Sequence, residues 1–222
     1  MYERASTAAI ILAGGSSSRM NAGRHKLLLP LGDRPVLAHV IDATLASQVA
    51  SIIIVLGHQS AQVHSHISHY LVNPKITIIE NPDYLQGMST SLRTGLQVLT
   101  KKNQNTLSSA LSSTESALVM LGDQPLITTY IIDTLIATWK ETGKQIIAPL
   151  YKGKRGNPIL FSACLFNELM EVTGDEGGRK VIERHRQELA TVELSDDVAS
   201  YDVDTWEAYQ QVVAEWSRKQ TQ

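Results

Sequence analysis

The chain has 222 residues, 43% of them hydrophobic, and its 20 basic and 22 acidic side chains leave a formal net charge of −2. This length suits one large domain or two small ones with a substantial core. The near-zero charge argues against nucleic acid as the main partner, because binding to a phosphate backbone usually requires a basic excess.

A single cysteine, Cys164, excludes an internal disulfide and an all-cysteine metal site. Its apolar surroundings predict a buried packing thiol rather than a nucleophile. The amino terminus has no basic segment followed by an apolar stretch, and no apolar run approaches the roughly 20 residues of a membrane span. We therefore expect a soluble, cytoplasmic protein that does not engage a membrane.

An apolar run from Ala8 to Leu12 predicts a buried strand, and the loop that follows it up to Lys26 is the most informative segment of the chain. Gly14 and Gly15 permit close approaches, so several N–H groups can turn toward one anion, while Arg19 and Lys26 add positive charge. The two common phosphate-loop patterns, G-x-x-x-x-G-K-[ST] and G-x-G-x-x-G, are both absent. A plain strand-to-helix turn with solvated charges is the alternative interpretation.

The next part of the chain alternates between helix and strand. The spacing of apolar residues predicts a helix from about Pro35, a strand over 52–56, a helix over 59–71, a strand over 76–79 and a helix over 87–99. Four histidines in this region lack a carboxylate or cysteine at ligand spacing, so solvated helix histidines are favoured over a metal site: His58, His64, His66 and His69.

Two polar features follow predicted strands. Ser89 and Ser91 lie at the start of the 87–99 helix, where hydroxyls and free N–H groups suit an anion or a sugar, although simple helix capping is an equal alternative. Asp123 lies just past a strand over 117–121, the place where open α/β sheets put their ligands. A ligand role for Asp123 is favoured over capping of the next helix.

The remaining elements complete the same alternation. Residues 101–116 are polar and Ser-rich and predict a surface insertion. We expect a helix from about 131, a strand over 146–150, a basic loop over 151–158, a short apolar run over 159–161, a helix to about 172, a glycine-rich turn over 174–179, a helix over 180–187, an edge strand over 190–194 and a final helix. The residues of the final helix at helical spacing are expected to face the core: Trp206, Tyr209, Val213 and Trp216.

This pattern predicts a single domain, residues 1–222, of the α/β class: a three-layer α/β/α, Rossmann-like arrangement around a mainly parallel sheet. The loop at Gly14, the helix start at Gly87 and Asp123 all follow strand ends. We therefore expect them to meet on one edge of that sheet.

Several motifs, in order along nearly the whole chain, carry a resemblance to a known family. They are LAGGSSSRM, KLLLPLG, NP, GMSTSLRTGL, LGDQP, GNPILF, GDEGGR and DVDT. Together they resemble the molybdenum cofactor nucleotidylyltransferases, which belong to the nucleotide-diphospho-sugar-transferase-like proteins, and GDQP, GNP and GDEGGR match the cytidylyltransferase branch best. The resemblance implies an enzyme that joins CMP from CTP to the phosphate of the molybdenum-bearing molybdopterin and releases pyrophosphate.

The resemblance also implies roles for particular residues. The triphosphate would be held by the first loop: Leu12, Ala13, Gly14, Gly15, Ser16 and Ser17, with Arg19 and Lys26. The base and ribose would lie near Asn81, Gly87, Ser89 and Ser91. Mg²⁺ would be bound by Asp123 together with the terminal motif, where Asp204 is favoured over Asp202. The pterin substrate would face Asn157 and the segment Asp175, Gly177, Gly178 and Arg179. A molybdenum hydroxylase is a possible recipient of the product.

The physical chemistry of this reaction is consistent with these side chains. Nucleophile and electrophile are both anionic, so the site needs charge neutralisation, which Mg²⁺ on one or two carboxylates can provide. Arg19 can bind oxygens bidentately, whereas Lys26 acts as a point charge. A phosphate nucleophile is already ionised at neutral pH, so no general base is required.

Two departures from the family pattern leave alternatives open. Asn21 replaces a usual glycine, with two extra residues between Arg19 and Lys26, and LAGG is common in the guanylyl branch, which would use GTP. A guanylyl or sugar-phosphate nucleotidylyltransferase is therefore the alternative within the class. From other classes, we retain an NAD(P)-dependent oxidoreductase, against which the missing G-x-G-x-x-G argues, and a non-catalytic carrier of the molybdenum cofactor.

Overall fold

The structure is a computed structural model that describes residues 6–15, 25–100, 114–195 and 197–220. Its strands are β1 (Ser6–Ala13), β2 (Pro30–Leu31), β3 (Arg34–Pro35), β4 (Ser51–Leu56), β5 (Ile76–Glu80), β6 (Thr114–Leu121), β7 (Ile146–Tyr151), β8 (Lys154–Arg155), β9 (Ile159–Ser162) and β10 (Leu189–Leu194). Its α-helices are α1 (Val36–Leu45), α2 (Ser60–Ile67), α3 (Met88–Thr100), α5 (Thr129–Thr142), α6 (Phe166–Met170), α7 (Arg179–Arg184) and α8 (Trp206–Gln220). Short 3₁₀ helices include Lys26–Leu28, Tyr84–Gln86, Gly174–Glu176 and Val198–Ser200.

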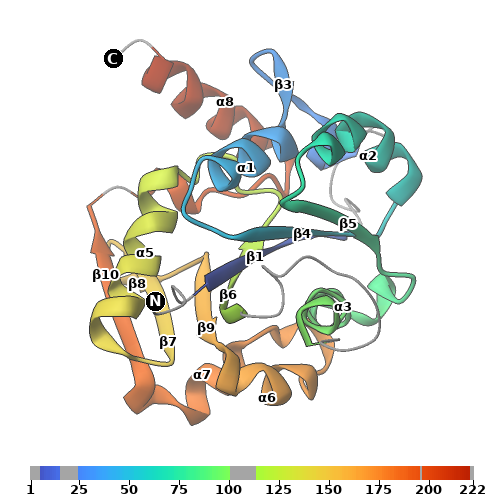
Figure 1. Ribbon diagram of the computed structural model, residues 1–222. Helices are drawn as coiled ribbons and strands as arrows, with labels where there is room; N and C mark the ends of the chain where they lie inside the picture. The colour runs from blue at the N-terminus through green and yellow to red at the C-terminus, as the bar shows by residue number, and fades with distance from the viewer. Residues whose placement is uncertain (1–5, 16–24, 101–113, 196, 221–222) are drawn as a thin grey trace.

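A central sheet runs through the molecule in the order β10-β7-β9-β6-β1-β4-β5, and β8 pairs with β7 (Figure 1). The strands β1, β4, β5 and β6 are parallel to one another, as are β7 and β10, whereas β9 runs antiparallel between β6 and β7. The sheet is therefore mainly parallel, as the sequence predicts, and β10 is an edge strand as expected.

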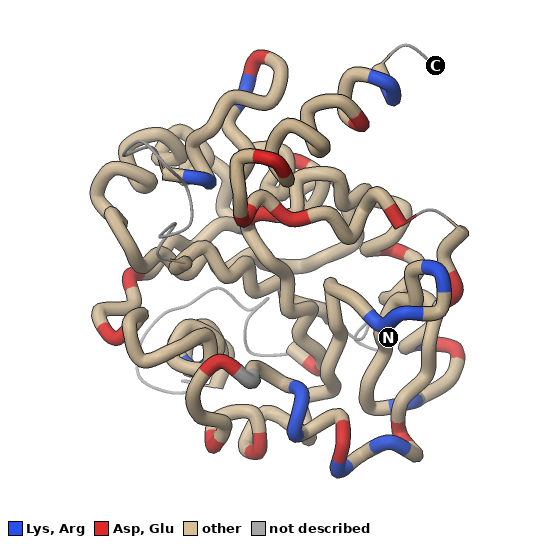
Figure 2. The backbone as a smooth tube through the Cα atoms, turned by 180° about the vertical axis from the view of Figure 1, so that it is seen from behind, with Lys and Arg blue, Asp and Glu red and all other residues tan. Residues whose placement is uncertain are grey.

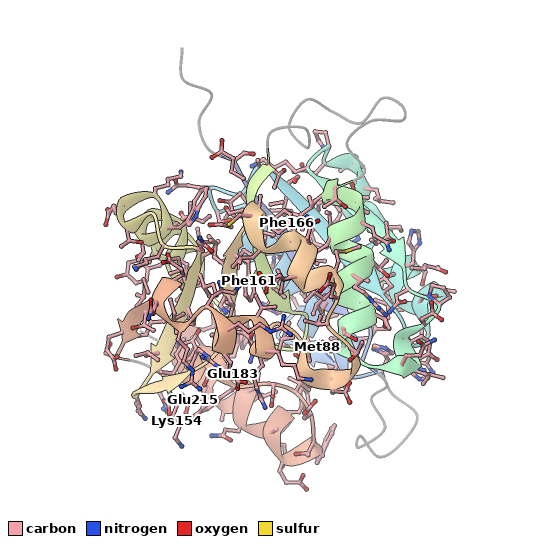
Figure 3. All side chains as sticks on the ribbon, turned by 90° about the horizontal axis from the view of Figure 1, so that it is seen from below. Met88, Lys154, Phe161, Phe166, Glu183 and Glu215 are labelled. Atoms are coloured by element: carbon pink, nitrogen blue, oxygen red, sulfur yellow. The ribbon has the colours of Figure 1, made fainter. Side chains whose placement is uncertain are left out.

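Helices cover both faces of this sheet, which gives the predicted three layers (Figure 1). Successive side chains of β1 point to opposite faces of the sheet, so the buried residues form two cores. Ala9 and Ile11 join a core with α1, α2 and α5, while Ala8 and Ile10 join a second core with α3, α6 and α7. Figure 3 views the second face, where the labelled Phe161 of β9 and Phe166 of α6 belong to one buried cluster.

A third, smaller apolar cluster fastens the carboxyl-terminal segment to the sheet. Val203, Tyr209 and Val212 pack with Leu29, Leu31, Val36 and Leu126. The Tyr209 hydroxyl donates to the carbonyl of Pro30 at 2.5 Å. Helix α8 therefore lies outside the two main cores, against the β2–β3 hairpin, and fixes the segment that precedes it. In Figure 1 it is the red helix beside α1 and β3.

The structure corrects four details of the sequence interpretation. Cys164 is exposed, because the apolar side chains of Leu165 and Phe166 occupy the core side of that turn. Trp206 is 44% exposed, since Tyr209 and Val212 are the buried members of α8. Thr114–Ser116 belong to β6 rather than to the Ser-rich insertion, of which residues 101–113 lie outside the described residues.

The fourth correction concerns His58, which lies in the turn after β4 rather than on a helix. Its ring stacks on that of His25, with centroids 5.9 Å apart.

Charge is distributed over the molecule rather than concentrated. Figure 2 shows Lys and Arg interspersed with Asp and Glu along the chain. Within the described ranges, no helix has both the length and the apolar character needed to cross a membrane.

Candidate active site

The carboxyl ends of β1, β4 and β6 meet at one edge of the sheet, where the sequence predicts a site. Leu12 is in register with Leu121, and the N–H of Gly122 donates to the carbonyl of Leu12 at 2.9 Å. Gly57, after β4, lies so close to Gly14 that a Cβ on Gly57 would come within 2.7 Å of the Gly14 Cα. Glycine at both strand ends is what allows them to come together.

A cleft of about 430 Å³ opens at this edge. Its walls come from the ends of β1 and β6, the start of α3 and the segment before α8. The lining residues that were predicted from sequence are Leu12, Ala13, Gly14, Gly15, Lys26, Gly87, Ser91, Asp123, Asp175, Asp202 and Asp204. The structure thus brings together segments that are far apart in the chain. We call this cleft the first cavity.

The Lys26 ammonium lies between two carboxylates in the first cavity. It donates to Oδ2 of Asp123 at 2.5 Å and to Oδ1 of Asp204 at 2.6 Å. The Lys26 and Asp123 side chains are only 11% and 14% exposed, so their attraction is poorly screened by water. Burial alone would lower the pKa of Lys26, but the two carboxylates raise it above its ordinary value and keep the side chain charged.

Asp202 adds a third carboxylate to the same wall. Burial, together with the negative charges of Asp123 and Asp204, raises the pKa of Asp202 above its usual range. The site therefore holds more negative than positive side-chain charge among its described residues, which favours the binding of a further cation.

His25 holds the start of the segment that carries Lys26. Its Nδ1 accepts from the N–H of Leu27 at 3.3 Å, and its Nε2 lies 3.1 Å from the carbonyl of His58. Because a carbonyl only accepts, Nε2 is the protonated nitrogen of a neutral ring. Burial, the main cause, lowers the pKa of His25 to about 4, so the ring is neutral near pH 7.

The start of α3 forms another wall of the first cavity. Asn81, at the end of β5, donates through Nδ2 to the hydroxyls of Thr90 at 2.8 Å and Ser91 at 3.0 Å. Gly87 adopts a φ of 107°, and a Cβ there would lie 2.6 Å from the carbonyl carbon of Gly174. Only glycine allows α3 to begin this close to the 174–176 turn.

A second cavity of about 210 Å³ adjoins the first, and the two share the side chains of Leu12, Met88, Leu121 and Asp175. It is lined by all five residues predicted to face the pterin: Asn157, Asp175, Gly177, Gly178 and Arg179. Arg155 of β8 and Phe161 of β9 also line it. In Figure 3, Met88 lies at the start of α3 on the side that faces α6 and α7.

Some predicted residues fall elsewhere. Ser16, Ser17 and Arg19 lie outside the described residues. Asn81 and Ser89 are buried and line neither cavity; the Ser89 hydroxyl has no hydrogen-bond partner within the described ranges. For all of these, a direct contact with nucleotide stays a prediction.

Sequence reasoning missed several residues that line the cavities. Tyr84, Leu85 and Met88 line the first. Arg155 lies in the basic 151–158 loop, so its charge was visible in the sequence, but nothing there shows that it joins Arg179 across the second cavity.

The carboxylates of the first cavity fit a magnesium ion that takes part of its coordination from substrate. Carboxylate oxygens suit this metal, which keeps waters and is usually held by one or two carboxylates plus phosphate oxygens. Within the described part of the chain, no three His, Cys, Asp or Glu side chains are grouped closely enough to hold a metal alone. Asp123 and Asp204, both already placed around one cation, are the suitable pair.

Comparison with known proteins gives one family. The MobA-like NTP transferase domain matches residues 9–189. Molybdenum cofactor cytidylyltransferase of Escherichia coli K12 is 31% identical over 202 residues, which cover 88% of this chain and 90% of that protein. A homologue of Mycobacterium tuberculosis Rv0371c, from Mycobacterium sp. strain JC1, superposes with a TM-score of 0.77 at 28% identity, over 96% of this chain and 97% of that one.

A further solved structure, Rv0371c of M. tuberculosis in complex with manganese, superposes with a TM-score of 0.70 at 24% identity, over 94% of this chain and 98% of that one, and at this identity it shows the fold alone. The family match spans most of the chain, including β1, β4 and β6, whose ends form the first cavity. This chain therefore belongs to the MobA-like NTP transferase family and is a nucleotidyltransferase.

Proposed function

We propose that this enzyme transfers CMP from CTP to the phosphate of molybdenum-bearing molybdopterin, with release of pyrophosphate. The observation that carries the proposal is the pair of adjoining cavities, one lined by the glycine turn and four carboxylates, the other by two arginines and an asparagine. A transfer between two bound phosphates requires such neighbouring sites. The name of the E. coli relative supplies the acceptor and the nucleotide.

The first cavity suits the nucleotide. The backbone N–H groups of Gly14 and Gly15 can face the triphosphate, and in the proposal Ser16, Ser17 and Arg19 extend this cradle. Gly87 and Ser91, which line the same cavity, lie where base and ribose are expected. The Lys26 ammonium is 3.8 Å from where a Gly15 Cβ would stand, so a change of side-chain rotamer brings it to the phosphates.

The second cavity suits the acceptor. The guanidinium groups of Arg155 and Arg179 can bind a phosphate bidentately, and the Asn157 amide can meet a polar ring edge. Phe161 and Ile182 provide an apolar surface for a flat heterocycle. The two cavities share a wall at Met88 and Asp175, and in the proposal the acceptor phosphate meets the α-phosphate of the nucleotide there.

The reaction then needs positioning and charge neutralisation. An ionised oxygen of the acceptor phosphate attacks the α-phosphorus and forms a new P–O bond. The bond from the α-phosphorus to the oxygen that bridges to the β-phosphorus breaks, and its electron pair leaves with pyrophosphate. Lys26 stabilises the charge that develops on this leaving group by electrostatic interaction in a partly buried site.

Nucleotidyltransferases of this kind use divalent metals. For this chain we propose Mg²⁺ bound by Asp123 and Asp204, with Asp202 nearby; when bound, it would neutralise the phosphate charges and polarise the reacting phosphoryl group. The carboxylates themselves orient the loop ends and hold Lys26 in place until phosphate oxygens are available.

The test is pyrophosphate release from CTP and from GTP, with Mg²⁺, in the presence and absence of molybdenum-loaded molybdopterin. We expect release only with the pterin present and mainly from CTP. An Asp123→Asn variant serves as the inactive control, and Asp133→Asn on α5, which accepts from the N–H of Gln48, serves as the matched active one. Pterin-dependent release from GTP would assign the enzyme to the guanylyl branch. Release that requires a sugar phosphate and not the pterin would show that a sugar phosphate is the acceptor.

A further inference from the structure

Gln124 links the two segments that carry the carboxylates of the first cavity. It follows Asp123 directly, and its Nε2 donates to the carbonyl of Ser200 at 3.1 Å. Ser200 ends the 3₁₀ helix Val198–Ser200, two residues before Asp202. Gln124 is only 5% exposed, so the donor of this part-buried bond is shielded from solvent.

A second connection lies beside the first. The N–H of Val203, between Asp202 and Asp204, donates to the carbonyl of Asp123 at 3.0 Å. The Val203 side chain is fully buried and packs with Leu126, which follows Gln124 by two residues. One side-chain bond, one backbone bond and one apolar contact thus set how far Asp204 stands from Asp123.

The distance between Asp123 and Asp204 matters because one cation, either the Lys26 ammonium or a bound metal, must contact both carboxylates. Lys26 contacts Asp123 and Asp204 at 2.5 and 2.6 Å. A displacement of the 202–204 segment by 1 Å would break one of these contacts, since hydrogen bonds weaken steeply beyond about 3.2 Å. A metal bound by the same two carboxylates tolerates even less variation.

Burial alone does not explain an amide at position 124. Its Oε1 has no hydrogen-bond partner within the described ranges. An unpaired buried acceptor is unfavourable, whereas a methionine of similar length would fill the space without one. The amide therefore contributes something other than packing, and the hydrogen bond that it makes among the described residues leads to the segment of Asp202 and Asp204.

We propose that Gln124 is a positioning residue for the cation site: it holds the 200–204 segment at the distance from Asp123 that lets one cation contact both carboxylates. This inference rests on the proposed function in that the cation is the metal of the nucleotidyl transfer. Outer partners that orient metal ligands typically change metal affinity 10- to 100-fold when they are removed.

The experiment compares Mn²⁺ binding, followed by electron paramagnetic resonance with CTP present, in the unaltered protein and in Gln124→Met. We expect the Mn²⁺ affinity to fall about tenfold. The Mn²⁺ concentration for half-maximal turnover should rise by a similar factor, while kcat at saturating metal recovers to within about twofold. A loss of kcat without a change in this concentration would overturn the proposal, because it would indicate a general structural effect.

Ser116→Ala is the matched control. It removes a buried hydrogen bond, 2.8 Å between Ser116 and Thr7, at the opposite end of the strand that leads to Gln124. We expect wild-type Mn²⁺ affinity in this variant. Gln124→Asn, whose amide is one methylene too short for Ser200, provides a second test and should match Gln124→Met.

Hydrogen exchange keeps the two proposals separable. In Gln124→Met, amide exchange across residues 198–205 should become faster than in the unaltered protein, whether or not metal is present. If the unaltered protein bound no Mn²⁺ with CTP, the metal of the proposed function would fail, and exchange alone would decide the role of Gln124. Unchanged exchange in both Gln124 variants would overturn that role.

Discussion

The Lys26 ammonium donates a hydrogen bond of 2.5 Å to the Asp123 carboxylate in the first cavity. Lys26 follows the glycine loop, and Asp123 follows the neighbouring strand β6, so this pair joins the ends of two parallel strands. The pair connects two segments of the fold, and in the proposed mechanism it also belongs to the reacting centre. The two contributions can be separated by measurement.

Lys26→Met should reduce kcat by about a hundredfold or more, because it removes the cation that stabilises the leaving pyrophosphate. It should also destabilise the fold by about 1–3 kcal/mol, less than for a fully buried pair, since Asp204 is 37% exposed. Urea unfolding and pyrophosphate release measure the two effects. Lys140→Met on α5 removes the same charge from an exposed surface and should change neither.

The pH dependence of Lys26→Met should also differ from that of the unaltered protein. In the unaltered protein the raised pKa of Lys26 means that its stabilising charge is present at neutral pH and is lost only as the pH rises above the ordinary lysine range. Without Lys26 the carboxylates repel one another, so mild acidification should reduce the stability of the variant less than that of the unaltered protein. A variant that loses stability in parallel with the unaltered protein would contradict this account.

His25 gives the folding stability a pH dependence opposite in sign to that of Lys26. Its pKa is about 4 in the folded protein against 6.5 for an ordinary histidine, so the unfolded chain binds the proton more readily between these values. Stability should therefore fall as the pH drops through this window, by about 3 kcal/mol. Urea unfolding at several pH values measures it.

His25→Gln is the comparison that isolates this effect. The raised pKa of Asp202 acts in the other direction, because the folded protein binds that proton more readily, but it is common to both proteins. The stability advantage of the unaltered protein over His25→Gln should therefore be full near pH 7 and shrink as the pH falls toward 4. Parallel profiles would show that His25 does not titrate as its burial implies.

Gly57, which packs against Gly14, and Gly15, which lines the first cavity, give a prediction that separates fold from function. A Cβ on Gly57 would lie 2.7 Å from the Gly14 Cα and the Tyr84 Cβ, so Gly57→Ala should destabilise the protein by about 1–3 kcal/mol. Among the described residues, a Cβ on Gly15 would meet only the Lys26 side chain, at 3.6 Å. Gly15→Ala should keep the melting temperature but weaken CTP binding, because the methyl group enters the cavity; equal melting losses in both variants would refute this.

The sequence predicts the fold well because its apolar patterns are strong and local. Fully buried strands such as β4 read as continuous apolar runs, and the glycine turn and Asp123 lie where parallel strands end. The orientation of single side chains was harder, as the exposed Cys164 and Trp206 show. Cys164 lies in a 3₁₀ helix of one turn and Trp206 is the first residue of α8, and at such positions helical spacing does not decide which side chain reaches the core.

The contacts between individual side chains that are far apart in the chain could not be predicted from the sequence. Nothing in the chain order indicates that Lys26 lies between Asp123 and Asp204, or that Gln124 reaches Ser200, because both depend on how the segment before α8 returns to β6. The Asn81 amide illustrates the same limit: its motif was visible, but its role in holding Ser91 emerges only from the packing of α3.

Arg179 and Arg155 line the second cavity from different elements, α7 and β8. If this cavity binds the acceptor phosphate, Arg179→Ala should raise KM for the pterin substrate about tenfold or more, since a hydrogen bond to a charged group contributes about 1.5–3 kcal/mol. KM for CTP should stay within about twofold, because Arg179 does not line the first cavity.

Arg155→Ala should act the same way. Arg186 lines neither cavity, so Arg186→Ala is the control. Steady-state kinetics with each substrate varied in turn distinguish the cases: a rise in KM for CTP in place of that for the pterin would assign the two cavities the other way round.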